Sequence, residues 1–359
     1  MREPVRVLVL GTGQMGAGIA RLVRQKPGLA LAGAYGRRTE RAGLDLGRAL
    51  GLDQDLGVLI SADLSAVTEQ TRPHIAIQAT CSRLADATGE IFTLLRHGVP
   101  VISIAEEMAY PACSSPDLAG ELHRLASEQG VAVLGTGVNP GFVLDLLVIT
   151  LTGVCADIQS ITAERINDLS PYGPTVLRSQ GVGLPPEVFR QGLENGAVTG
   201  HYGFPQSIHM IAAALGWTLE RIEETREPII VSRVRRETPF VTVEPGQVAG
   251  CRHTAVAYME GRPVITLSHP QQVRPELEGV ETGDLIAITG TPNLRLRGAP
   301  EIPGGIATCA LAVNMIPRVL NALPGLHTMA DLPVPAALLG DARRFLHQPS
   351  QESSHSDSN

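Results

Sequence analysis

Two adjacent carboxylates, Glu106 and Glu107, are the side chains in this sequence best placed for acid–base chemistry. They follow an expected strand at residues 99–103, where an enzyme built on a parallel sheet places groups that face its substrate. A carboxyl group with a raised pKa can give and take protons near neutral pH. The same pair also suits the start of a helix, because the helix dipole favours acidic side chains there.

A glycine-rich turn, Gly-Thr-Gly-Gln-Met-Gly, lies between an apolar run at residues 5–10 and a helical pattern at residues 15–24. Its first glycine permits a tight turn, its second lets the backbone approach a pyrophosphate, and its third lets the helix pack closely on the strand. The phosphates would then meet the free N–H groups at the helix N-terminus. This context favours dinucleotide binding over a glycine turn without a ligand, through Gly11, Thr12, Gly13, Gln14, Met15 and Gly16.

Two arginines follow the second expected strand, which spans residues 30–35. An acidic residue in this place would bind the ribose 2′-hydroxyl of NAD, but the chain has Arg37 and Arg38 and no carboxylate before Glu40. Guanidinium groups bind a 2′-phosphate with paired hydrogen bonds. We therefore expect NADP(H) to be preferred, with NAD(H) possible. The alternative is that the arginines are solvated at the start of a helix.

Loops after the later strands should carry the nicotinamide end of the cofactor. Strands are expected at residues 75–78, 99–103 and 131–134, with helices at 84–97 and 116–129 between them. Parallel strands end at one edge of their sheet, so the residues expected to touch the cofactor there are Ala79, Thr80, Ser82 and Asn139. Asn139 equally suits the N-cap of a following helix.

The alternation of strands and helices predicts an α/β fold whose N-terminal part is a Rossmann domain with a doubly wound parallel sheet. After it we expect a buried helix at 141–154, and then β-rich segments that suggest a second α+β domain with an open mixed sheet. The NAD(P)-binding domain is placed at residues 1–140, closed by a C-terminal helix at 304–325, and the substrate and dimerisation domain at 141–303. The tail at 347–359 is predicted to be disordered.

Composition and charge exclude several classes of function. The net charge is −7, so no basic field attracts nucleic acid or an anionic membrane, and no apolar run is long enough to span a bilayer. No leader segment is evident, so the expected location is cytoplasmic. The five cysteines form no CxxC pair, which argues against a metal site or a disulfide framework. Lys26 is the only lysine in the chain, which argues strongly against a Schiff-base mechanism and against a lysine as the acid–base catalyst.

The chain resembles the 2,4-diaminopentanoate dehydrogenase family and its relatives, the native amine dehydrogenases, within the wider dihydrodipicolinate reductase-like group. The resemblance runs from Val5 to about Leu332. It is carried, in this order and spacing, by the glycine-rich turn and by five further segments. These are Ala-Glu-Glu-Met-Ala-Tyr-Pro at 105–111, Thr-Gly-Val-Asn-Pro-Gly-Phe at 136–142, Arg-Ile-Asn-Asp at 165–168, Gly-His-Tyr-Gly at 200–203 and Pro-Gly-Gly-Ile-Ala-Thr at 303–308.

The resemblance implies reversible NAD(P)-dependent oxidative deamination of an amine to a ketone or aldehyde plus ammonia. Glu106 is the expected acid–base group, with Glu107 as the second choice, because a carboxylate can deprotonate ammonium and later help hydroxide to leave. A homodimer formed through the open second sheet is expected by analogy. The substrate pocket is expected to involve Val138, Phe142, Arg165, Asn167, His201 and Thr308.

The sequence leaves the substrate and two other classes of function open. A diamino acid, as in 2,4-diaminopentanoate dehydrogenase proper, needs carboxylate recognition, for which Arg165 is the candidate, whereas a simple amine needs only an apolar pocket. A C=N or C=O reductase on the same scaffold would act without ammonia. A protein that senses NADP(H) would bind the cofactor without chemistry and has no need of paired carboxylates. Arg165 and His201 also suit structural roles, as an interdomain ion pair and a loop histidine.

Overall fold

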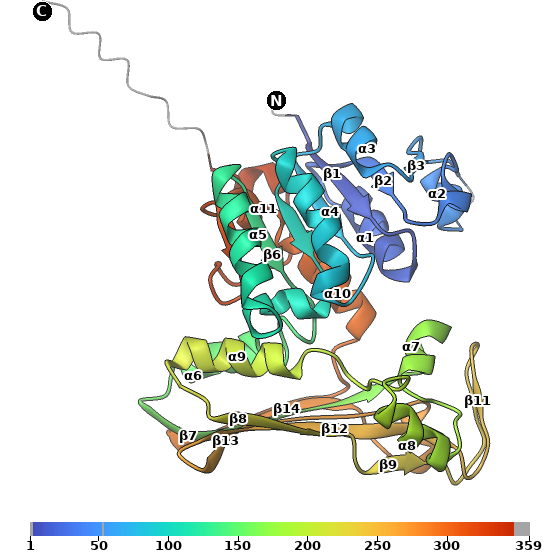
Figure 1. The fold of residues 1–359 in the computed structure, drawn as a ribbon, viewed down its shortest axis with the longest axis vertical. Coiled ribbons are helices and arrows are strands. Elements are labelled where there is room, and N and C mark those ends of the chain that lie inside the picture. The colour runs from blue at the N-terminus through green and yellow to red at the C-terminus, as the bar shows by residue number, and fades with distance from the viewer. Residues whose placement is uncertain (1–2, 52–53, 348–359) are drawn as a thin grey trace, which may run out of the picture.

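Strand β1 (Val5–Leu10) belongs to a seven-stranded sheet in which all neighbouring strands are parallel (Figure 1). The structure, a computed structural model, describes residues 3–51 and 54–347. The strand order is β16-β6-β5-β4-β1-β2-β3. Strands β2 and β3 are added on one side of β1, whereas β4, β5 and β6 are added on the other side, which confirms the doubly wound α/β fold. The other strands are β2 (Leu29–Tyr35), β3 (Ile60–Ser61), β4 (Ile75–Gln78), β5 (Val101–Ser103), β6 (Ala132–Gly135) and β16 (Gly325–His327).

Five main helices cover the two faces of this sheet: α1 (Gln14–Gln25), α3 (Leu64–Thr71), α4 (Leu84–Arg96), α5 (Pro116–Glu128) and α10 (Gly304–Asn314). Strand side chains alternate between faces with a period of two. Val7 and Val9 therefore join the core shared with α1 and α10, whereas Leu8 and Leu10 join the core under α3, α4 and α5. Both faces are covered, which explains why β1 is apolar throughout.

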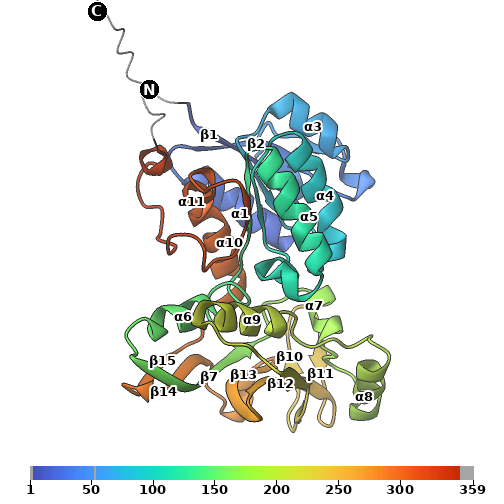
Figure 2. The same cartoon turned by 60° about the vertical axis from the view of Figure 1, so that its left-hand side comes forward.

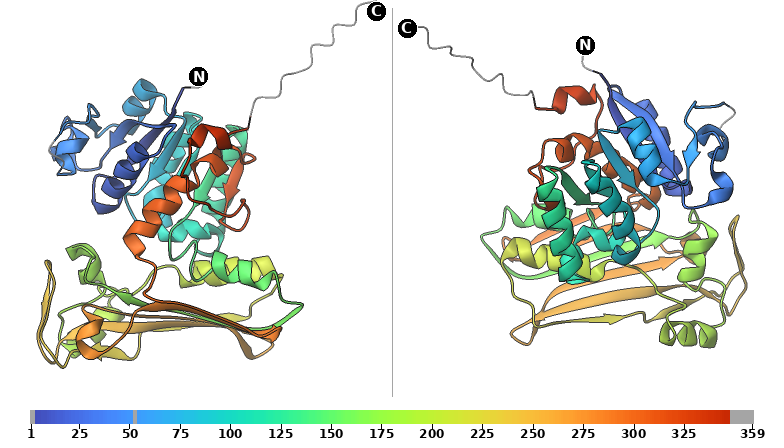
Figure 3. Two further views of the ribbon diagram at one scale, coloured as in Figure 1. Left: turned by 180° about the vertical axis from the view of Figure 1, so that it is seen from behind. Right: turned by 45° about the horizontal axis from the view of Figure 1, so that its top comes forward.

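The prediction of one continuous C-terminal helix at 304–325 is wrong, because the segment forms two helices and the start of a strand. After α10 comes α11 (Ile316–Leu320), and β16 then pairs with β6 at the edge of the first sheet. Pro317 explains the break, since proline lacks the N–H group that a continuous helix needs and fits only a first turn. Figure 3 shows α10 rising from the second domain to pack on the first.

The second sheet is mixed: β7 and β13 run parallel, and its other pairs are antiparallel. Its order is β15-β14-β7-β13-β12-β8, with β9 also paired to β12. A separate two-stranded hairpin of β10 (Arg236–Glu237) and β11 (Thr242–Val243) lies at one end (Figure 1). The strands of the sheet are β7 (Asp157–Asp168), β8 (Arg221–Thr225), β9 (Ile229–Val231), β12 (Val248–Met259), β13 (Arg262–Gln272), β14 (Gly283–Thr291) and β15 (Leu294–Gly298).

Helices α6 (Leu146–Thr152) and α9 (Phe204–Leu215) lie between the second sheet and the first domain (Figure 2). The buried helix predicted at 141–154 thus begins later than expected. The carboxylate of Asp145 accepts hydrogen bonds from the N–H groups of Gly141 and of the first helical residue, both at 2.7 Å. Gly141 has a φ of 121°, which a right-handed helix does not contain, so the helix does not extend back through it.

Short elements complete the described chain: α2 (Leu46–Ala49), α7 (Pro174–Ser179), α8 (Pro186–Glu194), and the 3-10 helices η1 (Thr39–Arg41), η2 (Glu106–Ala109), η3 (Pro111–Cys113), η4 (Pro275–Glu278) and η5 (Ala342–Phe345). Within the described ranges, no helix has the length and apolar character needed to cross a membrane. Apart from His347, the tail predicted to be disordered lies outside the described residues.

Candidate active site

A cavity of about 630 Å³, here called the interdomain cavity, lies between the two domains and is lined by both. Segments that follow β1, β4, β5 and β6 line it from the first domain, and β7, β13 and α7 line it from the second. Parallel strands end at a common edge, so loops that are far apart in the sequence converge there. Figure 1 shows β1 running from the N-terminus toward the second domain, which directs that edge to the domain boundary.

Most of the predicted site residues line the interdomain cavity. The structure does not bring Phe142 there, since its ring packs against the main hydrophobic core, where an aromatic side chain is shielded from water. The predicted residues that line the cavity are Gln14, Met15, Arg37, Thr80, Ser82, Glu106, Val138, Asn139, Arg165, Asn167, His201 and Thr308. Those that do not are Gly11, Thr12, Gly13, Gly16, Arg38, Ala79, Glu107 and Phe142.

The three glycines of the turn at 11–16 have separate structural reasons. Gly11 has a φ of 110°, and a Cβ there would overlap the backbone of Ala79. A Cβ on Gly16 would overlap the backbone of Gly11, whereas one on Gly13 would meet nothing within 4 Å. The space beside Gly13, at the N-terminus of α1, is therefore open, and the N–H groups of the first helical turn point into it. This arrangement fits the pyrophosphate of a dinucleotide.

The arginines after β2 have different surroundings. Arg37 donates from Nε to Glu90 Oε1 at 2.6 Å, whereas Arg38 is exposed and its side chain makes no hydrogen bond or ion pair within the described part of the chain. Arg41, which the sequence analysis did not single out, donates from Nη1 to the backbone oxygen of Thr12 at 2.6 Å. Two arginines of this segment, Arg37 and Arg41, are thus engaged with the protein, and one is free for a ligand.

The structure distinguishes Glu106 from Glu107. Glu106 lines the interdomain cavity, and burial raises its pKa above the ordinary 4.5, against a hydrogen bond from Ser82 that lowers it. Glu107 Oε2 instead accepts a hydrogen bond from the backbone N–H of Leu84, at 2.7 Å, where α4 begins. Consecutive residues of a 3-10 helix point about 120° apart, which explains why the two neighbours diverge on η2. Of the two glutamates, Glu106 is the one that lines the interdomain cavity.

Arg165 and Asn167 lie on the same face of β7 and line the interdomain cavity. Arg165 is 1% exposed, donates from Nη1 to Asp284 Oδ1 at 2.6 Å, and donates from Nη2 to the backbone oxygen of Ile302. The alternative role as an interdomain ion pair is wrong, because Asp284 lies on β14, which pairs with β7 in the second sheet, and the ion pair is therefore within the second domain. This ion pair and the hydrogen bond to Ile302 do not use all the N–H donors of Arg165, because a guanidinium carries five.

Strand β13 adds His269 and Gln271 to the cavity, and the sequence analysis missed both. Gln271 lies opposite Asn167 in the parallel pair with β7. His269 is 5% exposed, and neither of its ring nitrogens has a hydrogen-bond partner among the described residues. Burial lowers its pKa well below 6.5, so the neutral ring offers one donor and one acceptor to a ligand. The sequence signal for both residues was the alternation along β13. His269 and Gln271 continue the row of inward-facing side chains that begins with Ile265 and Leu267.

Asn139 offers another unpartnered atom. Its Nδ2 lies 3.2 Å from His201 Nε2, while its Oδ1 has no partner among the described residues. Burial lowers the pKa of His201 well below 6.5, so its neutral ring can accept the hydrogen bond from Asn139. Asn139 does not cap a helix, because Asp145 is the N-cap of α6. Thr308 Oγ1 accepts a hydrogen bond from the backbone N–H of Val138 at 3.1 Å, which joins α10 to this loop.

Comparison with known proteins covers both domains. Residues 142–348 match the family model of the 2,4-diaminopentanoate dehydrogenase C-terminal domain, and residues 5–103 match that of the dihydrodipicolinate reductase N-terminus. A 2,4-diaminopentanoate dehydrogenase from Acetoanaerobium sticklandii is 43% identical over 355 residues, which cover 96% of this chain and 98% of the relative. The chain belongs to the 2,4-diaminopentanoate dehydrogenase family.

Membership makes this chain one of a family of NAD(P)-dependent dehydrogenases that act on amine groups. An amine dehydrogenase from Streptomyces virginiae is 27% identical over 93% of this chain and 98% of that relative. The structure of an amine dehydrogenase from Mycobacterium smegmatis matches with a TM-score of 0.82 and 31% identity, covering 92% of this chain and 97% of the other. The family predicted from the sequence motifs is thus confirmed.

Proposed function

We propose that this family member catalyses the reversible oxidative deamination of a diamino acid like 2,4-diaminopentanoate, which yields an amino keto acid and ammonia. The observation that carries the proposal is that Arg165 and His269 line the same cavity as Glu106. A simple alkyl amine would leave the ring nitrogens of His269 buried without hydrogen bonds, which is costly. The carboxylate and second amine of an amino acid supply the acceptor and donor that are missing.

This substrate was the alternative to a general amine dehydrogenase in the sequence analysis, and it has the better support. The family model of the diaminopentanoate enzymes spans 142–348, which includes the polar residues of β7 and β13. Identity to the diaminopentanoate dehydrogenase is 43%, compared with 27% for the Streptomyces amine dehydrogenase. The polar wall of the cavity and the relatives therefore favour the same substrate class.

Glu106 is the proposed acid–base group. A dinucleotide held by the turn at 11–16 would supply the hydride acceptor, and loss of hydride from the carbon that carries the neutral amine would leave the substrate as an iminium ion. The Glu106 carboxylate then takes a proton from the water that adds to the iminium carbon. It returns this proton to the nitrogen of the carbinolamine and then takes the hydroxyl proton as the C–N bond breaks, so that ammonia leaves and the ketone forms. A raised pKa suits both transfers, because the group must lose and regain a proton in each turnover.

Cofactor binding is proposed for the turn at 11–16 and for the loop residues Thr80, Ser82 and Asn139. The unpartnered Oδ1 of Asn139 is an acceptor for an N–H donor such as the carboxamide of the nicotinamide. We keep the expected preference for NADP(H), which Arg38 supports because its exposed guanidinium is free to bind a 2′-phosphate.

A homodimer is also part of the proposal. Helices α6 and α9 pack on the face of the second sheet that looks toward the first domain (Figures 1 and 2). The alternate side chains of the central strands, such as Thr254, Val256 and Thr266, are partly exposed on the opposite face. An open sheet face of this kind is suited to a subunit contact. Size-exclusion chromatography tests this, and a clean monomer at micromolar concentration would exclude the dimer.

The test of the proposed reaction mixes the protein with NADPH or NADH, ammonium at alkaline pH, and either 2-amino-4-oxopentanoate or cyclohexanone. We expect oxidation of the reduced nicotinamide that requires ammonium and is at least about tenfold faster with the amino ketone. Equal rates with cyclohexanone would refute the diamino acid substrate and favour a general amine dehydrogenase. Oxidation without ammonium would indicate a C=N or C=O reductase, and binding without oxidation a cofactor sensor.

A further inference from the structure

Glu90, on α4, is a buried carboxylate that joins two parts of the proposed cofactor site. Its Oε1 accepts the 2.6 Å hydrogen bond from Arg37 Nε, and its Oε2 accepts one from Thr80 Oγ1 at 2.5 Å. Arg37 follows β2, where the ribose of the cofactor is expected, and Thr80 follows β4. Glu90 is only 7% exposed, so its charge acts from inside the wall of the site.

A buried network holds this carboxylate in place. Gln78 Nε2 donates to Glu90 Oε2 at 3.2 Å, and Ser103 Oγ donates to Gln78 Oε1 at 2.5 Å. Gln78 and Ser103 are both fully buried. Arg37 is further tied to α4 by a hydrogen bond from Nη2 to the backbone oxygen of Asp86, at 2.7 Å. The guanidinium is therefore held against α4 by contacts on two of its nitrogens.

We infer that Glu90 sets the selectivity between NADPH and NADH by neutralising Arg37, which leaves Arg38 as the guanidinium for a 2′-phosphate. A carboxylate in contact with a guanidinium cancels most of its field at the distance of a ligand. The neighbouring residues Glu40 and Arg41 contribute one charge of each sign. With the charge of Arg37 cancelled by Glu90, a 2′-phosphate at the end of β2 meets one uncancelled arginine of this pair, and NADPH is favoured over NADH less than two free arginines would allow.

This inference rests on the proposed cofactor site and not on the proposed substrate. Its first test is the variant Glu90→Gln, whose amide oxygen can still accept from Thr80 but carries no charge. We expect the ratio of the NADH to the NADPH dissociation constant to rise about fivefold to tenfold, because the charge of Arg37 is no longer cancelled. The two constants are measured by fluorescence titration of the full chain without amine, so turnover does not enter.

The second test is the double variant Arg37→Gln with Glu90→Gln, which removes both charges together. We expect its ratio to stay within about twofold of the wild-type ratio, whereas Arg38→Gln should lower the ratio about tenfold. An Arg37 that bound the phosphate directly would make the double variant lose selectivity as Arg38→Gln does. The double variant leaves neither charge without its partner, so this test stands even where Glu90→Gln alone does not fold.

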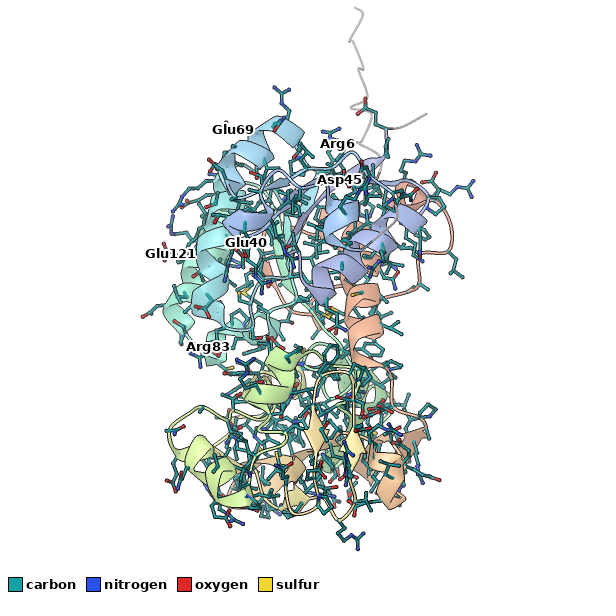
Figure 4. The ribbon with its side chains drawn as sticks, turned by 90° about the vertical axis from the view of Figure 1, so that its right-hand side faces the viewer. Arg6, Glu40, Asp45, Glu69, Arg83 and Glu121 are labelled. Carbon is teal, nitrogen blue, oxygen red and sulfur yellow. The ribbon has the colours of Figure 1, made fainter. Side chains whose placement is uncertain are left out.

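Glu121→Gln is the matched control, since this exposed carboxylate lies on α5, on the outer side of the first domain (Figure 4). The ratio of the NADH to the NADPH dissociation constant should be the same for this control as for the wild type. The rise in that ratio caused by Glu90→Gln should become smaller at high salt. An unchanged ratio in Glu90→Gln, or a tenfold loss in the double variant, would overturn the inference. Failure of the wild type to bind either dinucleotide would instead refute the cofactor site itself, which is a distinguishable outcome.

Discussion

The carboxylates of Glu106 and Glu107, adjacent in the chain, face two different cavities. Glu106 lines the interdomain cavity, whereas Glu107 lines a neighbouring cavity of about 530 Å³ and accepts the hydrogen bond from the N–H group of Leu84. Arg83 lies between the two cavities, since it lines both. Its Nη2 donates a hydrogen bond to the Tyr202 hydroxyl at 3.3 Å. Figure 4 shows Arg83 at the edge of the first domain that faces the second. Each glutamate can therefore be tested by its own substitution.

Glu106→Gln should lower the turnover number about 10²-fold to 10⁴-fold, because it removes the group that transfers protons. The dissociation constant for NADPH should stay within about twofold of the wild-type value, since no charge change is made at the phosphates. Glu107→Gln is the control: its amide oxygen can still accept from Leu84, so turnover should fall less than about tenfold. Steady-state kinetics of both variants is the measurement. If only Glu107→Gln were inactive, Glu107 and not Glu106 would be the acid–base group.

Glu106 should also make the protein less stable as the pH rises. Burial raises its pKa above 4.5, so the folded state binds more protons than the unfolded state between 4.5 and the raised value. Its contribution to the free energy of unfolding is full below pH 4.5 and is lost as the pH rises through the folded pKa. Urea denaturation should show Glu106→Gln equal to the wild type at about pH 4 and more stable than it at about pH 8. Equal stability at both values would contradict the raised pKa.

His269→Leu should raise the Michaelis constant for the amino ketone about tenfold to hundredfold, because the ligand loses a hydrogen-bond partner in a buried site. Activity with cyclohexanone should change less than about twofold and serves as the internal control. The substitution removes no protein hydrogen bond, so the melting temperature should be unchanged or higher. A fall in both activities together would show that His269 supports the fold of the site and not the substrate.

Arg165→Met should lower the free energy of unfolding by about 3–5 kcal/mol, because it leaves the carboxylate of Asp284 buried without its partner. The double variant with Asp284→Asn should recover most of this loss, since the amide is neutral and its oxygen can still accept from the N–H group of Ile302. Both variants should bind the amino ketone poorly. Denaturant unfolding measures the stabilities, and a single variant as stable as the wild type would exclude the ion pair as a stabilising contact.

Local patterns predicted the first domain well. The apolar runs at 5–10 and 75–78 coincide with β1 and β4, because a strand buried on both faces must be apolar throughout. Strand β16 was missed, since three residues at a sheet edge carry no periodic pattern that separates them from a loop. The break at Pro317 is visible in the sequence, because a proline inside an apolar helical pattern indicates that the helix ends or kinks there.

The sequence by itself determined the Rossmann turn, the family and the loops that meet at the cavity, because each depends on short-range patterns and on the common edge of parallel strands. Only the tertiary structure decided that Glu106 and not Glu107 faces the cavity, since this depends on the rotation of η2 against α4. It also decided that His269 stands beside Arg165 and that Glu90 reaches Arg37. These pairs are joined by strand register and helix packing between distant segments, which no local pattern of residues records.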